Sequence, residues 1–181
     1  MRKRSIAALA LLGLAACLAL KSSASTTAAV HPIWREVKWG YPVDQWGTGR
    51  AFRCNAADCG TDVDVFLRAK IGFCNCTTGV ADDPELERVS DFDLFGGQTT
   101  ALAPGHQIVV RWMKGRSRPY LLSGSRWQTK SILTIAFNDR CDVVVATAVV
   151  DPARFDKLEV VVLGFISGET AFRWVEQTLG L

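Results

Sequence analysis

The sequence predicts an α+β domain, an antiparallel sheet of about five or six strands with a C-terminal amphipathic helix packed on one face. Residues 61–76 alternate between apolar and polar side chains, which is the period of a strand with one face buried and the other in water. Residues 142–150 are nearly all β-branched or alanine, as in a buried central strand. Near the C-terminus, five residues recur at helical spacing on one face: Ala171, Trp174, Val175, Thr178 and Leu179.

The first 25 residues have the layout of a bacterial secretory signal peptide. Three basic residues, Arg2, Lys3 and Arg4, precede an apolar run over residues 6–20, and small residues follow it. At about 15 residues this run is shorter than the ~20 that a membrane-spanning helix needs. We therefore expect a periplasmic or secreted protein, with a flexible tether over residues 26–33 and a single domain over residues 34–181.

Cys17 leaves a second route of processing open. Residues 14–17, Leu-Ala-Ala-Cys, have the form of a lipobox, the motif at which bacterial lipoproteins are cut and lipidated on the cysteine. The apolar run continues past Cys17, which favours ordinary cleavage instead. We expect attachment to the inner or outer membrane only if Cys17 is lipidated.

The positive charge of the whole chain belongs to the signal segment. The chain has 21 Lys and Arg against 18 Asp and Glu, but four of the bases and none of the acids lie in the first 25 residues. The exported part therefore carries 17 bases and 18 acids, a net charge of −1. This balance argues against nucleic acid as a partner.

The first half of the mature chain predicts an arm, a strand and a short helix. Residues 31–53, rich in tryptophan and glycine, predict an irregular arm over the core, with or without short strands. Asp83 and Pro84 suit the N-cap and the first position of a helix.

The strand over residues 61–76 has its odd positions toward the core. This register places Cys74 and Cys76 on the outer side together with Arg68 and Lys70. A bulge at Gly72 would exchange the two faces.

The second half of the chain predicts strands at three further places, residues 106–113, 131–137 and 158–165. The first two are separated by a connection rich in glycine and arginine. Asp151 and Pro152 predict a short helical turn through about residue 157. The final helix has Ser167 as its expected N-cap and Gly180 as its C-terminal stop.

Five cysteines follow the signal segment: Cys54, Cys59, Cys74, Cys76 and Cys141. In an oxidising compartment they are candidates for disulfides, and the odd count leaves one thiol over. A local Cys54–Cys59 bridge is the simplest pairing, because an extended strand carries the next cysteine far away. The partner of Cys141 would then be Cys74 or Cys76, since all three lie at strand ends.

Cys74 and Cys76 also suit a different chemistry. Thiolates two residues apart fit Cu(I) or zinc, and with Cys54 and Cys59 they could form a tetrahedral site. The spacing lacks the Cys-x2-Cys knuckles of zinc sites, and neither histidine is near in sequence. We expect structural disulfides and no cofactor, with copper or zinc binding and thiol exchange as alternatives.

Motifs of known enzymes are scarce in this chain. It contains no Gly-x-Ser-x-Gly, His-Glu-x-x-His, phosphate-binding glycine loop or dinucleotide fingerprint. A pair of His106 with Cys76 or Cys141 is the remaining combination of base and nucleophile. We therefore expect no catalytic residue and favour a protein that is not an enzyme.

One local cluster of basic and aromatic residues is a candidate ligand surface: Arg111, Trp112, Lys114, Arg116, Arg118 and Arg126. Such a surface could bind a small anionic ligand or an acidic protein face in the cell envelope. The alternative is an exposed hairpin turn around Lys114 and Gly115, whose charges keep a sheet edge soluble.

The sequence thus predicts an exported, non-catalytic binding or accessory protein stabilised by disulfides. The alternative is a copper- or thiol-handling protein that uses Cys74 and Cys76.

Overall fold

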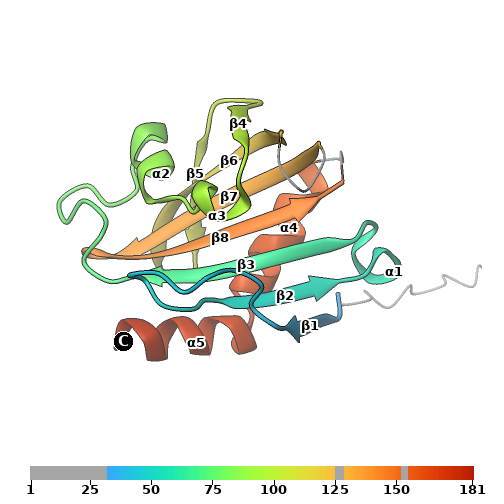
Figure 1. Cartoon of the computed structure of the whole chain (residues 1–181). Coiled ribbons are helices and arrows are strands. Elements are labelled where there is room, and N and C mark those ends of the chain that lie inside the picture. The colour runs from blue at the N-terminus through green and yellow to red at the C-terminus, as the bar shows by residue number, and fades with distance from the viewer. Residues whose placement is uncertain (1–31, 125–128, 152–154) are drawn as a thin grey trace, which may run out of the picture.

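The computed structural model describes residues 32–124, 129–151 and 155–181. Within these residues eight strands form one antiparallel sheet: β1 (Trp34–Val37), β2 (Arg50–Cys54), β3 (Val63–Lys70), β4 (Gln98–Ala101), β5 (His106–Val110), β6 (Met113–Ser123), β7 (Lys130–Asp139) and β8 (Asp142–Val150). The described helices are α1 (Ala56–Cys59), α2 (Asp83–Val89), α3 (Phe92–Phe95), α4 (Phe155–Ile166) and α5 (Glu169–Leu179). The strand order is β1-β2-β3-β8-β7-β6-β4, and β5 also pairs with β6 (Figure 1).

The α+β class and the C-terminal helical layer are confirmed, but the sheet has more strands than the five or six predicted. The largest omission is β6, which lies where a connection was predicted. In β6 the alternation between buried and partly buried positions does not follow an alternation of apolar and polar side chains. Gly115 and Ser117 are buried, whereas Arg116 and Arg118 are only partly so. The hairpin turn before β6 lies at Arg111 and Trp112, not at Lys114 and Gly115.

The strand predicted over residues 158–165 is wrong, because this segment forms most of α4. Its β-branched residues favour a strand, but tertiary packing outweighs that local preference. Both edges of β8 are already paired, by β3 and β7, so the segment following β8 crosses the sheet instead of extending it. Leu158, Val162 and Ile166 then recur at helical spacing, and all three are buried.

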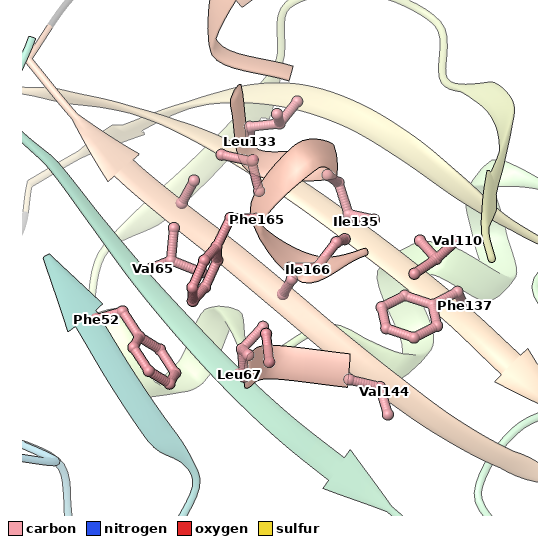
Figure 2. Packing of buried hydrophobic residues seen from close by; sticks show 14 of the residues in the cluster. Phe52, Val65, Leu67, Val110, Leu133, Ile135, Phe137, Val144, Phe165 and Ile166 are labelled. Atoms are coloured by element: carbon pink, nitrogen blue, oxygen red, sulfur yellow. The ribbon is translucent and has the colours of Figure 1, made fainter. Parts of the chain in front are cut away.

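One face of the sheet packs against α4 and α5. The core here joins residues of β3, β7 and β8 to Phe165, Ile166 and Val175 of the two helices. Figure 2 shows Phe165 and Ile166 lying over the sheet, with Phe52, Val65 and Leu67 in the same cluster. This is the helical layer that the sequence predicted, with a second helix added to it.

The opposite face of the sheet is also covered. Leu86 and Val89 of α2 lie in one cluster with residues of β7 and β8, and Phe95 of α3 lies in another with Tyr41 and Tyr120. Both faces of the central strands are therefore buried, which explains the continuous apolar run of β8.

The second layer, formed by α2 and α3 on this face, covers Arg68 and Lys70, so the prediction that these two residues face water is wrong. These two side chains are only 1% and 5% exposed. The predicted register also stops early, because β3 ends at Lys70 and the chain turns at Gly72, which has a φ of 67°. As a result Cys74 is buried and Cys76 is exposed, and the two do not share an outer face.

The helix ends differ from the predictions by one residue. The N-cap of α2 is Asp82, whose carboxylate accepts from the backbone N–H of Glu85, and Pro84 follows inside the first turn. The N-cap of α5 is Gly168 and not Ser167. Gly180 caps the C-terminus of α5 in the left-handed conformation, as expected.

Several predictions fall outside the described residues: the signal peptide over residues 1–25 with Cys17, the tether up to residue 31, Arg126, and the turn at Pro152. In the part of the chain that the structure describes, no helix is both long and apolar enough to span a membrane.

Candidate functional site

An apolar groove runs between the outer side of α4 and the first two strands. Its volume is about 610 Å³. Three parts of the chain line it: residues 32–34 with Phe52, then Val160, Val161, Gly164 and Phe165 of α4, and finally Gly168, Glu169 and Thr170 at the start of α5. These parts lie far apart in sequence, and the sheet brings them together.

The floor of the groove is aromatic. Trp34 of β1 stacks on Phe165 of α4, with ring centroids 4.3 Å apart, and Phe52 meets the same ring edge-on at 4.8 Å. These contacts hold β1, the edge strand, against the helix. They also place a rigid surface at the bottom of the groove.

The rim of the groove leaves apolar side chains in water. Val160 is 71% exposed and Ile33 is 55% exposed. Gly164 lies on the same side of α4 as Val160, and a Cβ atom added there would meet nothing within 4 Å. Glycine inside a helix costs about 1 kcal/mol relative to alanine, so α4 gives up stability at the position where the groove is open.

Charge is scarce along the groove. Glu169, at one end, is the single charged residue among the described residues that line it, and its carboxylate forms an ion pair with Arg173 one turn along α5. The described walls therefore offer a mostly apolar surface without an unpaired charge.

The five cysteines in the described part of the chain form two disulfides, Cys54–Cys59 and Cys76–Cys141, and leave Cys74 as a buried free thiol. This is the local bridge that the sequence favoured and one of the two partners it allowed for Cys141. Burial raises the pKa of the Cys74 thiol to about 11, and the nearby Glu85 carboxylate adds to this shift. Two disulfides are compatible with a disulfide-stabilised exported protein.

The two disulfides also bear on the alternative prediction that the cysteines bind copper or zinc. Among the described residues, no group of three or more His, Cys, Asp or Glu side chains could hold a metal ion. His106 Nε2 lies 3.1 Å from Glu159 Oε1 of α4, and the two cysteines considered as its partners, Cys76 and Cys141, are bonded to each other.

The predicted basic surface is divided between two places. Arg116 and Arg118 face α2, where Arg116 Nε lies 2.5 Å from Asp83 Oδ1 and Arg118 Nη1 lies 2.7 Å from Glu87 Oε1. Burial raises the pKa of Asp83, but its hydrogen bonds from Arg116 and from the N–H of Gly105 lower the pKa more, and the net shift is downward. These two arginines therefore attach α2 to the sheet.

The rest of the basic surface lies at the turn between β5 and β6. Arg111 donates from Nε to the carbonyl oxygen of Ser167 at 2.7 Å, and Trp112 packs edge-on against Phe172. Lys114 is exposed beside a polar cavity of about 410 Å³. Neither Lys114 nor Arg111 forms an ion pair among the described residues, and Arg111 lines a separate cavity of about 200 Å³ together with Trp112.

Sequence reasoning missed a buried charged cluster under the second layer. Lys70 Nζ lies 2.9 Å from Asp91 Oδ1 and donates to the carbonyl oxygen of Val89 at 2.6 Å. Arg68 lies 3.4 Å from the same carboxylate and forms a second ion pair with Asp44. The sequence does contain a signal for this cluster, because Arg68 and Lys70 occupy alternate positions of a strand that ends in a turn. Their burial, however, depends on α2 and α3.

A scan against protein-family models and a search of curated proteins both found no match to this chain.

Proposed function

We propose that this chain is an exported, disulfide-stabilised binding protein, not an enzyme, and that the groove beside α4 holds an acyl chain. The observation that carries this proposal is the groove itself, a hollow of about 610 Å³ with exposed apolar walls. Small-molecule sites typically enclose about 300–1,000 Å³ and are lined mostly by apolar and aromatic side chains.

The lining favours one chemical class of ligand. Aliphatic side chains of Ile33, Val160 and Val161 face an aromatic floor, in which the indole N–H of Trp34 is the one polar side-chain group. A strongly polar ligand placed there would lose its bonds to water and regain few of them. An unbranched hydrocarbon chain gains from burial at about 25 cal/mol per Å² of apolar surface.

The structure also argues for a small ligand over a second copy of the chain. The neighbouring edge strand β1 carries the exposed charged residues Arg35 and Glu36. A twofold pairing of β1 with itself, centred on Arg35 or Glu36, would set that residue opposite its own copy, and charged residues on an edge discourage such pairing.

A titration with cis-parinaric acid, a fluorescent fatty acid, tests this proposal on the oxidised mature protein. Gly164→Leu would fill the groove, and Val160→Asp would place a charge in its wall. Val43→Asp is the matched control, because Val43 is 69% exposed and lines none of the described cavities.

We expect the wild type and Val43→Asp to enhance the fluorescence of the probe equally and both groove variants to lose the enhancement. Competition with dodecanoate and with dodecanol then shows whether the chain alone is recognised or a carboxylate is needed. Equal binding by all four proteins, or a dimer that only the groove variants disrupt, would overturn the acyl-chain assignment.

The copper- or thiol-handling alternative rests on a separate observation, the contact of Cys74 with the turn that carries Cys141. In the structure Cys76 is bonded to Cys141, so Cys74 and Cys76 are not a free dithiol pair. Thiol exchange is therefore the form of this alternative that the contacts support.

A further inference from the structure

Three cysteines meet at the turn between β7 and β8. Cys141 lies in this turn and is bonded to Cys76. Cys74 contacts the backbone of the same turn at two successive residues, Arg140 and Cys141. Its backbone N–H donates to the carbonyl oxygen of Cys141 at 2.9 Å, and its thiol lies 3.2 Å from the carbonyl oxygen of Arg140.

These contacts place the backbone of Cys74 beside Cys141. A disulfide needs Cβ atoms about 3.5–4.5 Å apart. Because a backbone hydrogen bond already joins the two residues, a local rearrangement of the segment that carries Cys74 would suffice to bring the two sulfur atoms together. Cys76 is only two residues further along the chain, so either cysteine can reach the turn.

The two possible partners differ in their exposure. Cys74 is 5% exposed and packs in the cluster beneath α2 with Val80 and Leu86. Cys76 lies in an exposed turn that Asn75 holds, since the side-chain oxygen of Asn75 accepts from the N–H groups of Thr77 and Thr78. The identity of the bonded partner therefore decides whether the unpaired sulfur is hidden or open to solvent.

We propose that Cys74 is a second disulfide partner of Cys141, and that exchange moves the free thiol from buried Cys74 to exposed Cys76. In this step the Cys74 thiolate attacks the sulfur of Cys141. The Cys74–Cys141 bond forms, the Cys76–Cys141 bond breaks, and Cys76 leaves as a thiolate that takes up the proton lost by Cys74. The number of disulfides is unchanged, so no oxidant or reductant is consumed.

Burial keeps the observed pairing in place. A buried thiol is largely protonated, and the thiolate is the attacking species. Opening of the segment over residues 71–79 would expose Cys74 and permit the exchange. The product displays a thiol site at Cys76 that can take a soft electrophile or form a mixed disulfide with a partner's cysteine.

This site is independent of the apolar groove, because Cys74 lies on the α2 side of the sheet and the groove lies on the α4 side. Loss of one activity would therefore leave the other intact, and the two proposals fail separately.

The first test uses the variant Cys76→Ser, with Cys74→Ser as its matched control. Oxidised Cys76→Ser is expected to contain a Cys74–Cys141 disulfide, seen as the loss of two hydrogens in the intact mass. Oxidised Cys74→Ser is expected to keep the Cys76–Cys141 bond. A folded Cys76→Ser protein that retains two free thiols would overturn the proposal.

The second test uses the wild type, so that a folding defect in the variant cannot obscure the result. The protein is held with N-ethylmaleimide in mildly alkaline buffer for hours, the timescale of uncatalysed disulfide rearrangement. Fragmentation of the non-reduced peptide that contains both Cys74 and Cys76 then locates the label. A label on Cys76 with Cys74 bonded to Cys141 supports exchange, and a label confined to Cys74, or none, overturns it.

Discussion

Lys70 Nζ and Asp91 Oδ1 lie 2.9 Å apart, with their side chains 5% and 9% exposed. Burial lowers the pKa of Lys70, and the attraction of Asp91 offsets part of that shift. Asp91 also faces Arg68, which is 1% exposed. One carboxylate thus serves two buried cations at the junction of α2, α3 and the sheet, and the second layer depends on it.

Replacing Asp91 by asparagine should be strongly destabilising. Lys70 would lose its only carboxylate within 4 Å among the described residues, and Arg68 would keep only Asp44. Removing one partner of a buried ion pair typically costs about 3–5 kcal/mol. The change is measured as a shift in the urea midpoint, with exposed Asp93→Asn as the control at about 0.5 kcal/mol or less. Equal losses in the two variants would contradict a structural role for Asp91.

Asp83 should contribute to stability at neutral pH and lose that contribution in acid. Its pKa in the folded protein lies below the usual 3.8, so the stabilisation is present above that value and disappears as the pH falls through the folded-state pKa. Asp83→Asn should therefore show a smaller drop in unfolding free energy on acidification than the wild type.

A double-mutant cycle attributes this effect to the pair. Asp83→Asn and Arg116→Gln, measured singly and together at neutral pH, should show a coupling energy of about 0.5–3 kcal/mol, because the two side chains are in direct contact. Additive losses would show that the ion pair does not fasten α2 to β6.

The Cys74 thiol should make stability decline in alkaline solution. Its pKa rises from the usual 9.0 to about 11 on folding. Below pH 9.0 the thiol is neutral in both states. Between these values it ionises in the unfolded chain first, so the folded state loses stability as the pH rises toward 11. Chemical denaturation across this range should show a steeper decline for the wild type than for Cys74→Ala. Parallel curves for the two proteins would contradict a buried thiol.

The two disulfides should differ in what they contribute. They close segments of 5 and 65 residues, respectively. The loop-entropy relation then assigns about 2 kcal/mol to Cys54–Cys59 and about 4 kcal/mol to Cys76–Cys141. Cys141→Ser should therefore lower the unfolding free energy more than the double variant Cys54→Ser/Cys59→Ser does. The opposite order would show that packing around Cys54, which is fully buried, outweighs loop closure.

The parts of the fold that were predicted correctly depend on local sequence patterns. The apolar run of β8, the alternation of β3 before Gly72, and the glycine stop at Gly180 each depend on neighbours in sequence. The Cys54–Cys59 bridge was predicted for the same reason, since its two ends lie five residues apart.

The missed parts depend on contacts between distant segments. β6 alternates basic residues with Gly115 and Ser117, and only the acidic face of α2 explains why Arg116 and Arg118 can lie against the sheet. In the same way, α4 is helical where its β-branched residues favour a strand, and both edges of the preceding strand β8 are already paired, by β3 and β7.

The groove could not be predicted, because it joins residues 32–34 and Phe52 to α4 and α5. One signal was present in the sequence. The segment over residues 158–166 is apolar on nearly every side, so as a helix it would leave an apolar face uncovered, and Val160 shows that it does.

The most direct measurement of the central claim is the contact between a bound chain and the groove wall. Protein with labelled Ile and Val methyl groups is titrated with dodecanoate, and intermolecular nuclear Overhauser effects are recorded. We predict effects from the chain to the methyl groups of Ile33, Val160 and Val161, and none to Val43 or Val109 outside the groove. Effects confined to Val43 or Val109, or saturating concentrations of dodecanoate without any effect at Val160, would contradict the assignment of the groove as an acyl-chain site.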